Sequence, residues 1–137
     1  MNIVKTSLIM LATSLVLVAC GSKNIFQWSS EGPIDDMTCV QWKEGSDPDG
    51  WDNNYLCSEE DYGIKWRLAG PIDGMQCINM NDPDQPSEHT WGDNHLCVPA
   101  DSSLAFQWST DGEIEGMTCL EITEPNDANW KDNYLCY

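Results

Sequence analysis

Along most of the chain, hydrophobic residues form short runs, and stretches rich in Asp, Asn, Gly and Pro separate them. Residues 37–42 and 117–122 combine apolar, β-branched and aromatic side chains in the manner of short strands. Residues 55–57, 95–98 and 134–137 form a second set of strand-like runs. Gly-Pro, Asp-Pro and Asp-Gly pairs mark turns between the runs, and helix signals are scarce. The pattern predicts an all-β fold.

The same arrangement of Trp and Cys occurs three times, in residues 26–63, 64–105 and 106–137. In each copy the first Trp lies 11 residues before the first Cys, and the second Trp lies 6 residues before the second Cys. Only the stretch between the two cysteines varies, since they are 18, 20 and 17 residues apart. The sequence therefore predicts one domain, residues 26–137, built from three copies of a unit of about 40 residues with three or four strands each.

Three such copies fit two architectures. In a closed threefold fold, such as a β-trefoil or a three-sheet prism, each copy supplies a third of one core. In an open array, each copy packs only on its neighbours along the chain. The presence of Trp and paired Cys in each of three units resembles the ricin-type β-trefoil lectins, although their Gln-x-Trp element follows the second Cys and Gln27-Trp28 precedes the first. We expect the closed form, with the open array as the alternative.

The N-terminus has the features of an export signal. A basic start is followed by an apolar stretch, residues 8–19, that is too short to cross a hydrocarbon core of about 30 Å. The stretch ends in Leu17-Val18-Ala19-Cys20, which resembles the lipobox of bacterial lipoproteins. The resemblance implies a signal peptide over residues 1–19 and a lipid on Cys20, with residues 20–25 as a short tether and acyl chains such as palmitate in the membrane.

The same resemblance bears on location. Gly21 follows the cysteine, where an Asp would indicate retention in the inner membrane of enteric-type bacteria. The chain is therefore expected outside the cytoplasm, anchored to a membrane by its lipid, and on the outer membrane if the source is Gram-negative. Beyond the lipobox, the repeats are similar to tandem Trp/Cys-rich units of other secreted proteins that end in WxDNxLC.

The cysteine count agrees with an oxidising compartment. Seven cysteines minus Cys20 leave six, two in each copy. Repeat symmetry selects one pairing among the possible ones: Cys39 with Cys57, Cys77 with Cys97, and Cys119 with Cys136. Each bridge would close a loop near 20 residues, which is worth about 3 kcal/mol in the chain-entropy model. The close Cys/His spacings of zinc sites are absent, so no metal is expected on these cysteines.

Two sets of repeated residues have different surroundings. The first Trp of each copy, together with a following Ile and Met, has apolar neighbours and is expected in the core. These residues are Trp28, Trp66, Trp108, Ile34, Ile72, Ile114, Met37, Met75 and Met117. The second Trp of each copy has polar, turn-forming neighbours, so we expect it to be less fully buried than the first.

A Trp beside Asp and Asn suits a sugar, because the ring stacks on the apolar face while carboxylate and amide groups bind hydroxyls. The candidate ligand-binding residues are Trp51, Asn53, Asn54, Tyr55, Trp91, Asp93, Asn94, His95, Trp130, Asp132, Asn133 and Tyr134. The alternative is structural: the Asp and Asn side chains bond to the local backbone in Asx-turns, and the Trp covers the disulfide.

Acidic residues dominate the charge, with 23 Asp and Glu against 6 Lys and Arg and a net charge of −17. This balance excludes nucleic acid as a partner, because phosphates require Lys and Arg. Acids also cluster between the two cysteines of each copy, at Glu44, Asp47, Asp49, Asp82, Asp84, Glu88, Glu124 and Asp127. Their oxygens are possible Ca²⁺ ligands, but the EF-hand spacing is absent, so solvated acidic loops and no cofactor are expected.

No catalytic residues are predicted. The two histidines, His89 and His95, both lie in copy two, and Tyr occupies the His95 position in the other copies. Neither a Ser/His/Asp nor a Cys/His set is indicated, so an enzyme is not expected. The leading expectation is a lipid-anchored module that binds carbohydrate at repeated Trp/Asp/Asn sites. The alternatives are an acidic module that binds or inhibits cationic proteins, and a structural surface lipoprotein.

Overall fold

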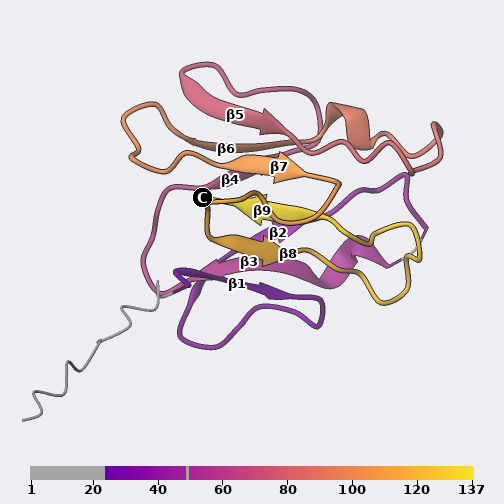
Figure 1. The fold of residues 1–137 in the computed structure, drawn as a ribbon, viewed down its shortest axis with the longest axis horizontal. Helices are drawn as coiled ribbons and strands as arrows, with labels where there is room; N and C mark the ends of the chain where they lie inside the picture. Colours follow the sequence, from indigo (N-terminus) through magenta and orange to yellow (C-terminus); the bar gives the residue numbers. More distant parts are fainter. Residues whose placement is uncertain (1–23, 49) are drawn as a thin grey trace, which may run out of the picture.

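A computed structural model of the chain describes residues 24–48 and 50–137. The expected signal peptide and the expected lipidation of Cys20 lie outside these residues. The described part is all-β, as predicted, with nine strands in three sheets (Figure 1). The strands are β1 Phe26–Ser29, β2 Thr38–Trp42, β3 Asn54–Ser58, β4 Lys65–Arg67, β5 Met75–Asn79, β6 His95–Pro99, β7 Gln107–Ser109, β8 Cys119–Glu121 and β9 Tyr134–Cys136. Two short 3-10 turns precede β3 and β6, namely η1 Trp51–Asn53 and η2 Trp91–Asp93.

Each repeat forms one antiparallel sheet with the same strand order. The last strand of the repeat lies in the centre, so the orders are β1-β3-β2, β4-β6-β5 and β7-β9-β8. The first two strands of each repeat are therefore parallel to each other, and a crossover of about eight residues connects them. Successive residues of a strand face opposite sides of its sheet, so Leu56 pairs with Trp28 and Val40 on the core side, while Tyr55 faces outward.

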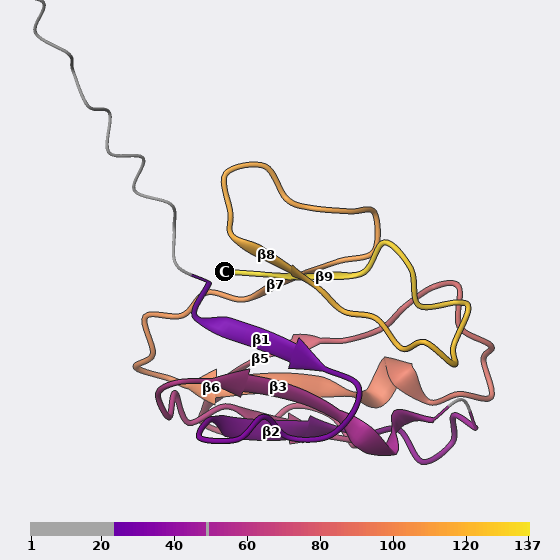
Figure 2. The same cartoon turned by 90° about the horizontal axis from the view of Figure 1, so that it is seen from below.

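The edges of the three sheets meet in pairs. β2 contacts β4, β5 contacts β7, and β1 contacts β8, so every sheet touches both others (Figures 1 and 2). One hydrophobic cluster draws residues from all three repeats. Within residues 24–48 and 50–137, strand pairing closes no barrel. The barrel that a β-trefoil would contain is thus not found, because each repeat pairs its three short strands only with one another.

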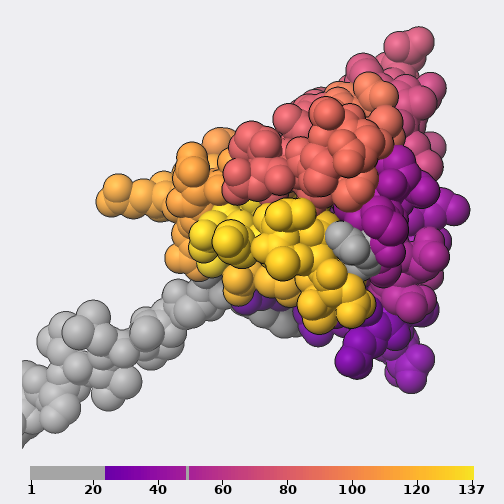
Figure 3. All heavy atoms as spheres, turned by 90° about the vertical axis from the view of Figure 1, so that its right-hand side faces the viewer, coloured from indigo at the N-terminus to yellow at the C-terminus, as the bar shows by residue number. Residues whose placement is uncertain are grey.

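The two ends of the molecule differ. β1 begins, and the chain ends, at the left-hand end of Figure 1. The long connections between the second and third strands of each repeat lie at the opposite end. Figure 3 views this loop end directly and shows the first (purple), second (salmon) and third (yellow) repeats meeting on it. Among the described residues, no helix has the length and apolar character needed to cross a membrane.

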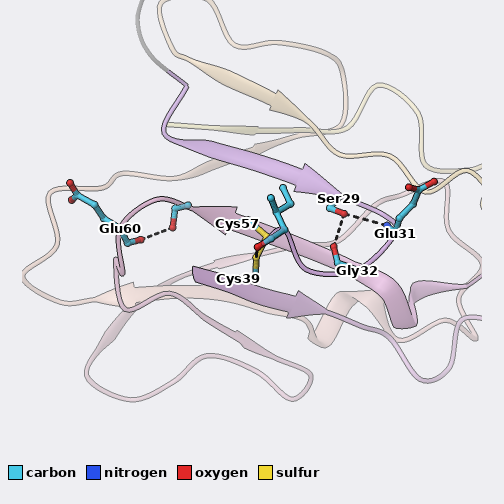
Figure 4. The surroundings of a disulfide bond; sticks show 8 residues. Ser29, Glu31, Gly32, Cys39, Cys57 and Glu60 are labelled. Carbon is cyan, nitrogen blue, oxygen red and sulfur yellow. Dashed lines mark hydrogen bonds between the residues drawn. A yellow bond between two sulfur atoms is a disulfide. The ribbon is translucent and has the colours of Figure 1, made fainter. Parts of the chain in front are cut away.

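The three predicted disulfides are confirmed. Cys39 bonds to Cys57, Cys77 to Cys97 and Cys119 to Cys136. In each case the two cysteines lie directly opposite each other on neighbouring strands. Figure 4 shows the first bridge beside the crossover from β1 to β2, where the Ser29 hydroxyl donates to the carbonyl of Gly32 at 2.6 Å. Each disulfide therefore links the central strand of a sheet to the strand that precedes it in the sequence.

Aromatic rings fill the centre of the molecule. Trp51, Trp91 and Trp130 form a triangle whose ring centroids are 4.4 to 4.6 Å apart. In the next layer, Trp42 stacks on Trp66 with centroids 4.8 Å apart and planes 13° from parallel. The tilted and edge-on ring contacts of the triangle stabilise the fold beyond what burial of the ring surface alone contributes. Each repeat supplies one ring of the triangle, so no repeat completes this core alone.

The first Trp of each repeat lies at the boundary between repeats rather than deep in the core. Trp28, Trp66 and Trp108 are half-buried, and each indole N–H donates to a main-chain carbonyl of another repeat. The acceptors are Thr123, Lys43 and Asn81, at 2.7, 3.0 and 3.0 Å. Trp28 of the first repeat thus bonds to the third repeat, Trp66 of the second to the first, and Trp108 of the third to the second.

The isoleucines and methionines expected in the core are also only half-buried: Ile34, Ile72, Ile114, Met37, Met75 and Met117. Met75 is the first residue of β5, and the other five belong to the crossovers, which lie outside the sheets. The backbone N–H groups of Ile72 and Ile114 approach the sulfur atoms of Cys77 and Cys119 at 3.3 Å. The prediction that these residues fill the core was wrong, and the three isoleucines instead lie beside the disulfides on the outer faces of the sheets.

Candidate binding site

The residues of the repeated WxDNxLC element do not form one exposed site. Trp51, Trp91 and Trp130 are 1%, 0% and 3% exposed and pack against one another. A ring with so little exposed surface presents no face on which a sugar can stack. The expectation that these three rings are stacking platforms therefore does not hold in this structure, because other repeats shelter them.

The adjacent asparagines connect the repeats. Asn54, Asn94 and Asn133 are 0% exposed, and each amide donates to a carboxylate of a different repeat. Asn54 donates to Glu124 at 2.8 Å and Asn94 to Glu44 at 2.7 Å. Asn133 donates in the same way to Asp82. These three asparagines are structural, since their amide groups hold neighbouring repeats together.

The three acceptor carboxylates occupy the acidic position five residues after the first cysteine of each copy. They were expected in solvated loops, but Glu44, Asp82 and Glu124 are buried. Burial alone would raise the pKa of Glu44, but hydrogen bonds from Ser46, Asn94 and Thr90 outweigh this effect and hold it below the ordinary 4.5. Protein donors thus occupy the oxygens that a Ca²⁺ ion would need.

No group of three or more His, Cys, Asp or Glu side chains in the described residues is arranged to hold a metal ion. The buried acids Asp47 and Asp127 instead accept hydrogen bonds from the Trp triangle. Trp91 donates to Asp47 at 2.9 Å and Trp51 to Asp127 at 3.3 Å. The hypothesis of a Ca²⁺ site therefore gains no support from this geometry.

A polar chain covers the loop-end side of the Trp triangle. The amide nitrogen of Gln85 donates to Asp127 at 2.8 Å, and the Gln85 oxygen faces Nδ1 of His89 at 3.0 Å. The same His89 nitrogen lies 3.4 Å from Asp47. Gln85 stands at the position that Asp47 and Asp127 occupy in the other repeats. These hydrogen-bonded side chains thus join all three repeats. The partner position of Trp130 holds Gln85, and the Trp130 indole N–H has no acceptor in the described part of the protein.

The other six candidate residues of the element reach solvent. Asn53, Asp93 and Asp132 are exposed at the loop end, and Tyr55, His95 and Tyr134 are half-buried on the outer sheet faces. By register, Tyr55 lies between Ser29 and Gln41, His95 between Arg67 and Asn79, and Tyr134 between Ser109 and Glu121. The twelve candidate residues therefore divide into six buried and six accessible ones.

The outer face of the third sheet is electronegative. Partial burial raises the pKa of the Tyr134 hydroxyl, and the negative charges of Glu121, Glu113 and Asp132 raise it further. The second sheet differs, because Lys65 and Arg67 stand on β4 where the other repeats have Gln and Ser. The three outer faces therefore share a geometry but not a charge.

The surface as a whole is strongly acidic. Of the 22 Asp and Glu residues in the described part of the chain, five are buried and the other seventeen are exposed. Only four bases accompany them, at Lys43, Lys65, Arg67 and Lys131. The acidic charge is therefore presented almost entirely to solvent.

A hollow of about 290 Å³ opens at the loop end beside His89. Its walls come only from the second repeat, where the stretch between the cysteines is longest. Asn81, Ser87, His89 and Asp93 contribute polar groups to it. Asn81, Ser87 and Gln85 are not among the candidate residues predicted from the sequence. Two features of the sequence could have pointed to this region: the longer spacing between the two cysteines of copy two, and Gln85 at a position where the other copies have Asp.

The chain was compared with protein-family models, curated proteins and solved structures, and no significant match was found in any of the three.

Proposed function

We propose that the chain is a lipid-anchored module outside the cytoplasm that binds cationic proteins or peptides through a rigid acidic domain. The observation that carries this proposal is the charge distribution of the described residues, with seventeen exposed acids against four exposed bases. Such a surface attracts cationic partners and repels anionic ones, and it speeds encounter through long-range steering. The buried Trp rings remove the strongest argument for the carbohydrate alternative.

The proposed domain is a closed, threefold, prism-like arrangement of the three sheets. This view is supported by the contact of β1 with β8, which belong to the first and third repeats. The bond from Trp28 to the carbonyl of Thr123 joins the same two repeats. An open array would leave the first and third copies apart. A closed core would hold the acidic loops in fixed positions.

The proposed anchor is the lipid on Cys20 that the lipobox resemblance implies. β1 begins at the end of the molecule opposite the long loops (Figure 1). A lipid attached a few residues before β1 would therefore turn the loop end away from the membrane. Partners arriving from outside would meet the loop end first, which favours it as the binding surface.

The direct test measures binding of the full chain, in neutral detergent micelles, to lysozyme as a basic probe protein. We expect affinity to fall by about tenfold or more between 50 and 300 mM NaCl, because exposed charges are screened within a Debye length of roughly 8 Å near physiological salt. Lysozyme with succinylated lysines is the matched control and should not bind. Absence of binding at low salt, or binding that is unaffected by salt, would contradict the proposal.

A second candidate, carbohydrate binding, is favoured by the outer sheet faces. Tyr55 and Tyr134 are half-buried at equivalent positions, each flanked by a polar side chain on the neighbouring strand. A Tyr ring beside Gln41 or Glu121 offers stacking and hydrogen bonding to a sugar. A glycan array probed with wild type and with Tyr55→Ala/Tyr134→Ala tests this candidate. Signals that the double variant loses would favour it, whereas an array without signals would exclude it.

A further inference from the structure

Residues that line the hollow in the second repeat are hydrogen-bonded to the other two repeats. Thr90 is fixed to the first repeat, since its backbone N–H and its hydroxyl donate to Ser46 and Glu44 at 2.8 and 3.2 Å. On the opposite wall, the backbone carbonyl of Asn81 accepts the indole N–H of Trp108 from the third repeat at 3.0 Å. Both walls are thus tied to neighbouring repeats, so the hollow is a preformed feature of the loop end.

His89 supplies a nearly buried group with an unused nitrogen. Its side chain is 10% exposed, and it lines the hollow. A carboxylate only accepts hydrogen bonds, so the amide nitrogen of Gln85 must face Asp127 and the Gln85 oxygen must face His89. The Nδ1 atom of His89 therefore carries the proton. In the neutral ring, Nε2 is then a lone-pair acceptor, and no bond to it is found among the described residues.

Three further side chains around the hollow have no hydrogen-bond partner within the described part of the chain. These are the amide of Asn81, the hydroxyl of Ser87 and the carboxylate of Asp93, and all three residues are exposed. Together with Nε2 of His89, they offer several acceptors, one of them negatively charged. Gly92 also lines the hollow, whereas the first and third repeats have Asp52 and Lys131 at this position. No side chain therefore enters the hollow from position 92.

From these observations we infer that the hollow receives a cationic side chain, the ammonium of Lys or the guanidinium of Arg, from the protein partner. This inference rests on the proposed function and names the place where it acts. Such a group has only N–H donors, which match the acceptors of Asp93, Asn81 and His89. A sugar fits less well, because no Trp, Tyr or Phe lines the hollow to stack on its ring.

Two substitutions test the inference in the full chain with lysozyme as the probe. Asp93→Asn removes the charged acceptor without changing its shape. Gly92→Lys restores the residue type of the third repeat and places an internal ammonium at the hollow. Position 92 tolerates a side chain, since a Cβ there would meet only Asn81 Oδ1, at 3.8 Å. Each variant has a control with the same change in charge at the equivalent position of another repeat: Asp132→Asn for the first and Asp52→Asn for the second.

We expect Asp93→Asn to weaken binding by about fivefold and Gly92→Lys by about tenfold or more, while each control changes it by less than about twofold. If wild type binds and each variant equals its control, the hollow is not the contact and only the proposed function stands. If wild type does not bind, both proposals fail. Titration of the chain with arginine amide and with methyl glucoside separates the ligand classes, and a response to the glucoside alone would overturn the inference.

Discussion

The indole nitrogen of Trp91 donates a hydrogen bond of 2.9 Å to Oδ2 of Asp47, which lies 44 residues earlier in the chain and in another repeat. Both groups are buried. Trp51 has the equivalent bond to Asp127, but Trp130 has no acceptor within residues 24–48 and 50–137, where Gln85 takes the place of the acid. The three repeats share one strand order but differ in this buried contact.

This difference predicts unequal effects of one substitution. Trp91→Phe and Trp130→Phe remove similar volume from the same triangle, but only Trp91→Phe also removes a hydrogen bond to a buried carboxylate. A hydrogen bond to a charged group is worth about 1.5–3 kcal/mol, so Trp91→Phe should be the more destabilising variant by roughly that amount. Denaturant unfolding of both variants measures the difference. Equal losses of stability would show that the bond to Asp47 contributes nothing.

The Asn94–Glu44 contact predicts a pH dependence. The folded-state pKa of Glu44 lies below the ordinary 4.5, so the stability contributed by its carboxylate is present above that pH and is lost as pH falls through the lower folded value. Glu44→Gln should therefore be less stable than wild type by about 1–2 kcal/mol at pH 7, and the gap should narrow below pH 4.5.

The control for this prediction is Glu115→Gln, which alters an exposed side chain. Its stability should stay within about 0.5 kcal/mol of wild type at every pH. Urea unfolding between pH 3 and 7 gives both comparisons. A gap between Glu44→Gln and wild type that stays constant over this range would contradict the assignment.

Much of the architecture could be read from the sequence. The spacing of Trp and Cys predicted three all-β units and the three disulfides, because these features recur within each copy. Contacts between copies were not visible in this way. Trp51 has polar neighbours in sequence, yet Trp91 and Trp130 shelter it in space. Glu44 reads as a solvated loop acid, although its donor Asn94 comes from the next copy.

The shared core predicts how loss of one disulfide affects the whole domain. The double variant Cys77→Ala/Cys97→Ala opens a loop with a sequence separation of 20 residues, which should lower stability by about 3 kcal/mol. Because the Trp triangle takes one ring from each repeat, we expect one cooperative thermal transition at a lower temperature. Calorimetry checks this. Separate transitions for the altered repeat and the other two would indicate independent units.

Backbone conformation predicts a stabilising change in the first crossover. Asp36 has φ 62°, in the left-handed region, and the equivalent positions in the other repeats hold Gly74 and Gly116. Glycine adopts this conformation without steric strain. Asp36→Gly should therefore raise stability by about 0.5–1 kcal/mol. The control is Asp35→Gly, since Asp35 is exposed but lies outside the left-handed region, and this variant should be less stable than wild type. Thermal unfolding of both variants measures the two changes in stability.

The central claim, that a cationic partner binds the loop end of an acidic domain, is tested most directly by mapping the contact. Amide chemical shifts of the full chain in neutral micelles can be followed during titration with a lysine- and arginine-containing peptide. We predict that the shifts concentrate in residues 81–93 and in the adjoining loops of the first and third repeats, and that they disappear at high salt. Shifts confined to the outer faces around Tyr55 and Tyr134, or no shifts at all, would contradict the claim.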